Sequence, residues 1–90
     1  SNELASPGNR VVYMCIKSPD GYLLTSESMP TFDYQGVATG YSASREVDYQ
    51  GKDVELGIYL NEIPEFVKGI YTVEAYTSQG RVGSAELMLR

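Results

Sequence analysis

The chain has 90 residues, 42% of them hydrophobic and 21% charged, so it carries enough apolar material for one small globular core and too much for a disordered tail. Seven Lys and Arg against twelve Asp and Glu give a net charge of −5 without a basic stripe, which argues against a nucleic-acid partner. No apolar run approaches the roughly 20 residues of a membrane-spanning helix, so we expect no direct membrane insertion.

The first nine residues are typical of a linker, and their opening Ser-Asn resembles what remains after an affinity tag is cleaved. The alternating pattern begins only after them. We therefore predict that residues 1–9 are tag remnant and linker, and that residues 10–90 form a single domain belonging to a larger protein.

Period-two alternation, interrupted by Gly, Pro, Asn and Asp, predicts short antiparallel strands in the first half of the chain. Residues 10–17 form the first strand. The segment Ser18-Pro19-Asp20-Gly21 suits a type I turn, from which residues 22–26 are expected to return antiparallel. Residues 27–49 contain only short, polar runs, which favour weak edge strands.

The second half of the chain has clearer signals. Residues 54–60 alternate as a strand that faces a core, and residues 61–69 form a crossover loop whose Ile63 and Phe66 plug the core end. Residues 70–77 and 82–90 then form a final hairpin around Ser78-Gln79-Gly80-Arg81.

Matching the apolar faces of that hairpin predicts its register. Val73 should lie opposite Leu87 and Tyr71 opposite Leu89, because a shift of one residue would turn both leucines outward. The same register sets Glu74 against Glu86, which costs some stability unless a cation intervenes.

The tetrapeptide Asp-Tyr-Gln-Gly occurs at residues 33–36 and again at 48–51. In each copy an alternating strand runs into Gln-Gly, and Gly36 or Gly51 supplies the permissive backbone of a turn. We interpret the repeat as turn chemistry. The alternative is that the two copies converge on one sugar or cation through Asp33, Tyr34, Asp48 and Tyr49.

Residues that carry chemistry are scarce. The chain has no His, which excludes Ser-His-Asp and Cys-His catalysis, and its acidic residues form no calcium-binding loop. No glycine pattern matches a phosphate-binding loop. We therefore predict no enzyme activity, no catalytic residue, no cofactor and no metal, and we expect the single cysteine, Cys15, to behave as a small buried hydrophobe.

Eight tyrosines without a tryptophan are the one compositional oddity. Tyr71 alternates with Val73 and Ala75 and is expected in the core. Tyr59 and Tyr76 fall on the face opposite the apolar one, so folding does not require their rings. β-propensity alone would explain them, and the alternative is an aromatic contact surface for a partner protein or a sugar. We predict these two as interaction residues.

The segment Gly69-Ile70-Tyr71-Thr72-Val73 resembles the start of the penultimate strand in immunoglobulin-like β-sandwiches, where a tyrosine anchors the preceding loop by its hydroxyl. Residues 83–89, Gly-Ser-Ala-Glu-Leu-Met-Leu, are similar to the final strand of Ig-like modules in bacterial surface and periplasmic proteins. The chain lacks the disulfide and core Trp of antibody-type domains.

This resemblance implies an all-β, antiparallel, Ig-like sandwich of about seven short strands. It implies structural roles for Gly69, Tyr71 and Val73, and a periplasmic or cell-surface setting. We predict a non-catalytic interaction or spacer module whose partner is another domain of its parent chain or a second copy. The alternative is a small carbohydrate-binding module that uses surface tyrosines.

Overall fold

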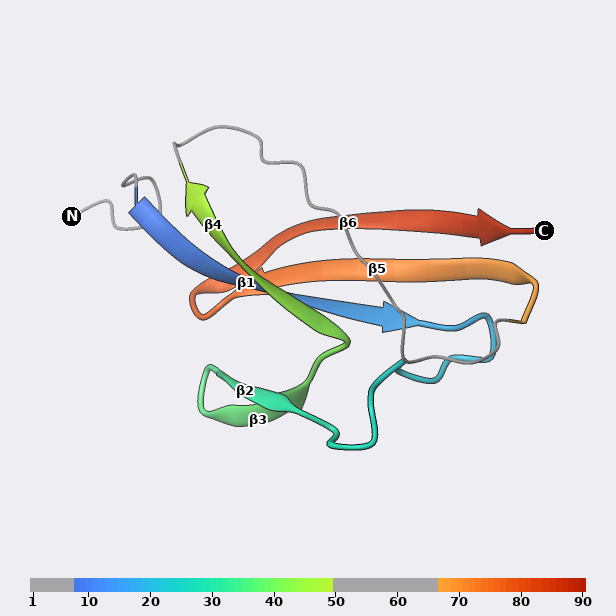
Figure 1. Ribbon diagram of the computed structural model, residues 1–90, viewed down its shortest axis with the longest axis horizontal. Coiled ribbons are helices and arrows are strands. Elements are labelled where there is room, and N and C mark those ends of the chain that lie inside the picture. Colours follow the sequence, from blue (N-terminus) through green and yellow to red (C-terminus); the bar gives the residue numbers. More distant parts are fainter. Residues whose placement is uncertain (1–7, 50–66) are drawn as a thin grey trace.

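The computed structural model describes residues 8–49 and 67–90, and this part of the chain is all-β and antiparallel (Figure 1). Four strands form one sheet in the order β4-β1-β5-β6, and two form a separate hairpin, β2-β3. Six strands are thus described where about seven were predicted. The strands are β1 (Gly8–Lys17), β2 (Thr31–Tyr34), β3 (Val37–Gly40), β4 (Ala43–Tyr49), β5 (Gly69–Thr77) and β6 (Gly80–Leu89).

Strand β1 lies inside the four-stranded sheet, paired with β4 on one side and β5 on the other. Val12, Met14 and Ile16 are buried on one face, which we call the aliphatic face. Tyr13 and Cys15 lie on the opposite face, called here the aromatic face. Because both faces are covered, β1 has a continuous apolar run rather than strict alternation. It begins at Gly8, so residues 8 and 9 belong to the sheet and not to the predicted linker.

The turn after β1 is present, but the strand predicted to follow it is not. Gly21 donates its amide to the Ser18 carbonyl at 2.9 Å and has a φ of 87°, the geometry of a turn closed by a left-handed glycine. Beyond it, pairing is limited to one bridge between Lys17 and Leu23.

Ser42 explains why the pairing between residues 22–26 and β1 stops after a single bridge. Its backbone amide donates to the Met14 carbonyl at 2.7 Å, and its hydroxyl accepts the Ile16 amide at 2.9 Å. These are the main-chain groups of β1 that a returning strand would need. The chain just before β4 therefore occupies that edge instead.

The first Asp-Tyr-Gln-Gly copy is a turn, as predicted. Gln35 and Gly36 join β2 to β3 with φ values of 53° and 85°, as a two-residue type I′ turn requires. The Asp33 carboxylate accepts the Gly36 amide at 2.8 Å. In the second copy, Asp48 lies on β4, and Gln50 and Gly51 lie outside the described residues. Among the strands that the structure describes, β4 is an outer one, as predicted for this region.

The hairpin of β5 and β6 forms, but the predicted register is wrong by two residues. Val73 lies opposite Ala85, and Tyr71 lies opposite Leu87. The turn is tighter than expected, because Thr77 already pairs with Gly80, and a bulge follows at Ala75/Tyr76. The extra residue of the bulge lies on β6 and makes the total shift an even number of residues. The apolar side chains of β6 therefore keep the predicted face despite the shift.

The new register removes the predicted clash of carboxylates. Glu74 lies opposite Ser84 instead of Glu86, and its carboxylate binds the Arg81 guanidinium at 2.9 Å. The strand predicted at 54–60 and the loop residues Ile63 and Phe66 lie outside the described residues. Within 8–49 and 67–90, no helix has the length and apolarity needed to cross a membrane.

Candidate interaction surfaces

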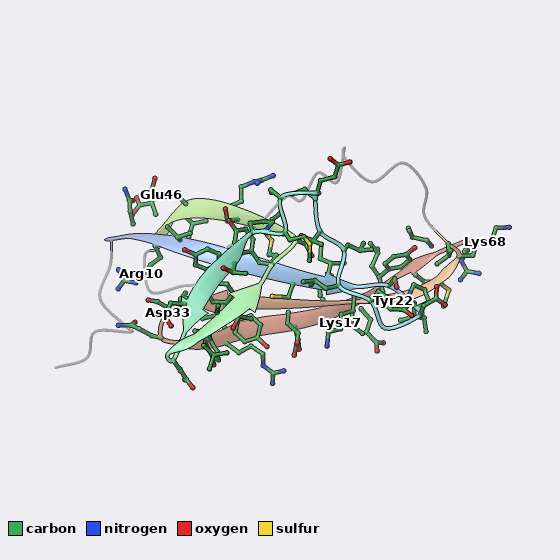
Figure 2. The ribbon with its side chains drawn as sticks, turned by 90° about the horizontal axis from the view of Figure 1, so that it is seen from below. Arg10, Lys17, Tyr22, Asp33, Glu46 and Lys68 are labelled. Carbon is green, nitrogen blue, oxygen red and sulfur yellow. The ribbon has the colours of Figure 1, made fainter. Side chains whose placement is uncertain are left out.

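Five aromatic rings join the β2–β3 hairpin to the aromatic face of the sheet. The Tyr13 and Phe32 rings stack with centroids 4.1 Å apart and planes within 5° of parallel. Tyr41 meets Tyr13 edge-on at 5.0 Å. The hairpin lies in front of β1 in Figure 2, with Asp33 and Tyr22 toward opposite ends of the molecule. The aromatic cluster consists of Tyr13, Phe32, Tyr34, Tyr41 and Tyr76.

Tyr76 belongs to this cluster and does not point away from the core as predicted. Its ring lies 5.0 Å from that of Tyr34 in an edge-to-face arrangement, and it pairs across the strands with Tyr13. The prediction requires this face of β5 to be exposed to solvent, whereas the β2–β3 hairpin covers it. Tyr59, the other predicted interaction residue, lies outside the described residues.

The Glu74 carboxylate contacts both a ring of the aromatic cluster and a charged side chain on β6. Its carboxylate accepts the Tyr76 hydroxyl at 3.2 Å while it pairs with Arg81. Burial, and after it the neighbouring Glu74 charge, raises the pKa of Tyr76. The phenol therefore stays protonated to higher pH than in water.

Cys15 is a buried free thiol held against β3. Its Sγ donates to the Gly40 carbonyl at 3.3 Å. Burial raises the pKa of the Cys15 thiol, Glu74 raises it further, and Lys17 acts in the opposite direction. A buried thiol kept in its neutral form is a poor nucleophile, which fits the structural role predicted for it.

The three predicted structural residues lie in the first five positions of β5. Tyr71 is 2% exposed, and its hydroxyl donates to the Val67 carbonyl at 2.5 Å, which ties the preceding segment to the sheet. Gly69 has a φ of 134°, and a Cβ there would lie 2.7 Å from Cγ of Pro19. Only glycine fits that position. Val73 is half-buried opposite Ile16.

Strand β6 presents a second surface, and sequence reasoning missed it. Among the described residues it pairs only with β5, at one edge of the sheet (Figure 1). Leu87 is 55% exposed and Met88 51%, with Val82 and Ile70 also exposed. From residue 83 to 89 the only charge is that of Glu86. We call residues 82–90 the β6 edge.

The opposite edge of the sheet differs in chemistry. Strand β4 has the sequence Ala-Ser-Arg-Glu-Val-Asp-Tyr, so three of its seven residues are charged. Charged side chains on an edge strand discourage further strand pairing. The two outer strands of the described sheet thus differ in charge.

In the part of the chain that the structure describes, no group of three or more His, Cys, Asp or Glu residues could hold a metal ion.

A family model for the domain of unknown function DUF8428 matches residues 1–90. The chain belongs to the DUF8428 family. No curated protein and no solved structure matches it.

Proposed function

We propose that this DUF8428 domain is a non-catalytic interaction module of a larger protein, and that it contacts its neighbour through the β6 edge. The observation that carries the proposal is the exposure of Leu87 and Met88 on a strand that has little charge and is an outer one in the described sheet. An edge strand offers unpaired backbone N–H and C=O groups, which an extended segment of a partner can pair with.

An Ig-like architecture is part of the proposal. The order β4-β1-β5-β6 has the same sequence of neighbours as strands C′-C-F-G of the larger sheet in variable-type Ig domains. In this alignment Tyr71 stands near the start of strand F, where Ig-like domains place their loop-anchoring tyrosine. The β2–β3 hairpin between β1 and β4 departs from that pattern.

The carbohydrate alternative draws less support from the geometry. Sugar-binding tyrosines present an open ring face, whereas Tyr13 stacks on Phe32, and Tyr34 meets Tyr76 edge-on. The rings contact one another within the domain. The periplasmic or cell-surface setting rests on the sequence resemblance and stays a prediction.

Hydrogen exchange in the parent protein tests the proposal. Backbone amides of residues 82–89 are expected to exchange more slowly in the parent protein than in the dilute isolated domain, while those of 43–48 on β4 exchange alike in both. Met88→Lys should abolish the difference, because lysine on an edge opposes strand pairing. Equal exchange of residues 82–89 in both proteins would leave only a spacer role, and a positive glycan array would favour the alternative.

A further inference from the structure

We infer that the β6 edge pairs antiparallel with the β6 edge of a second copy, in a register centred on Met88. The inference rests on the proposed function in using the same edge, and it commits that edge to a self-complementary partner. A twofold axis perpendicular to the sheet would relate the two strands, and twofold symmetry is the commonest symmetry of homo-oligomers.

The faces of β6 limit the possible registers. Ser84, Glu86 and Met88 lie on the aromatic face, since they pair with Glu74, Thr72 and Ile70. Ala85, Leu87 and Leu89 lie on the aliphatic face. A perpendicular twofold axis keeps each face on its own side, so every residue must stand opposite one from the same face. Only every second register remains.

Charge selects among the registers that remain. A pairing centred on Glu86 sets two carboxylates directly opposite each other, which is destabilising. Centres at Ala85 or Leu87 leave Glu86 opposite Ser84 or Met88, with no counter-charge directly across. β6 ends at Leu89, and in the proposed dimer the pairing extends by one residue to Arg90. A centre at Met88 then places Glu86 of each copy opposite Arg90 of the other, which gives two symmetric pairs of opposite charge.

The same register covers the exposed apolar side chains. Met88 meets Met88 of the second copy at the centre, beside Ile70, and Leu87 of each copy meets Leu89 of the other. Leu87 and Met88 are both more than half exposed in the single chain. Burial of such side chains is the main favourable term in association, and the charged pairs mainly specify register.

The pairing covers a short stretch of strand, so we expect a weak dimer. Residues 86–90 of each copy contribute, which is far less than the area of a standard stable interface. Sedimentation equilibrium of the 90-residue chain, at concentrations up to about 1 mM, should show the mean mass rising from monomer toward dimer. Added salt should shift this equilibrium only partly, since the apolar contacts are insensitive to screening.

Charge reversal tests the register. Glu86→Arg and Arg90→Glu should each raise the dimer dissociation constant about tenfold or more, because each places like charges opposite one another twice. The double variant Glu86→Arg/Arg90→Glu should restore the original value. Glu46→Arg on the β4 edge is the matched control and should change nothing, and far-UV circular dichroism verifies that each variant folds.

Two results would overturn the inference. A chain that stays monomeric at about 1 mM has no self-association through this edge. A dimer that tolerates both single reversals, or that the double variant fails to restore, uses another register or surface. Neither result touches the hydrogen-exchange comparison in the parent protein, which decides the proposed function independently.

Discussion

The Tyr71 hydroxyl is an example of one polar atom deciding how a segment is held. Its ring is among the buried residues of the aliphatic face, and its O–H reaches the Val67 carbonyl. A buried hydroxyl without a partner would carry a desolvation cost, so the hydrogen bond and the burial depend on each other. The bond connects β5 to the chain that enters it.

Removing that hydroxyl should destabilise the domain measurably. Tyr71→Phe is expected to lower the free energy of unfolding by about 1 kcal/mol, because the Val67 carbonyl loses its donor while the ring remains. Urea denaturation monitored by circular dichroism measures the change. Tyr22→Phe on an exposed residue is the matched control and should have no effect. Equal stabilities of the two variants would contradict an anchoring role for Tyr71.

At the scale of elements, the β2–β3 hairpin is held by its aromatic side chains. A four-residue strand pair is marginal by itself in water. Phe32 is buried, stacks on Tyr13, and lies near Tyr34, Tyr41 and Tyr76. The hairpin therefore depends on docking against the sheet, and the sheet depends on the hairpin to cover Cys15 and Tyr13.

Truncation of the central ring should release this element. Phe32→Ala is expected to cost about 3–5 kcal/mol, the range for a buried Phe, and to weaken the near-UV circular dichroism of the surrounding tyrosines. Val37→Ala changes an exposed side chain of the same hairpin and serves as the control. If the near-UV signal survives the loss of Phe32, the cluster does not hold the hairpin.

For the whole molecule, the two raised pKa values predict a loss of stability in alkaline solution. Cys15 and Tyr76 both have a higher pKa in the folded chain, mainly because of burial, so the folded state favours their neutral forms. The stabilisation is complete below the unfolded thiol pKa of about 8.5 and is lost as pH rises through the folded values.

Denaturation measured from pH 7 to 10.5 should show this decline. Cys15→Ala should flatten its first part, between the unfolded and folded thiol pKa values, and should keep most of the part due to Tyr76, because burial and Glu74 raise the Tyr76 pKa more than Cys15 does. The same burial predicts slow labelling of native Cys15 by a thiol reagent at neutral pH and fast labelling in denaturant. Fast labelling of the native chain would show that the thiol is accessible.

The sequence by itself determined the features that depend on neighbouring residues along the chain. Alternation predicted β1, β5 and β6. Local residue types predicted the turn after β1, at Ser18-Pro19-Asp20-Gly21, and the turn between β2 and β3, at Gln35-Gly36, because backbone preferences act locally. The buried position of Tyr71 was also predictable from the strand's alternation. The need for glycine at position 69 was implied only by the Ig-like resemblance, and its contact with Pro19 depends on the fold.

Only the tertiary structure decided which strands meet and which faces are covered. The register of β5 and β6 depends on a bulge that shifts pairing by one residue, and the alternation of side chains does not reveal it. The place of Tyr76 depends on Phe32, which lies more than 40 residues away in sequence on the docked β2–β3 hairpin. The exposed β6 edge likewise follows from strand order, because the strand's own pattern is the same whether it lies at the centre or the edge of a sheet.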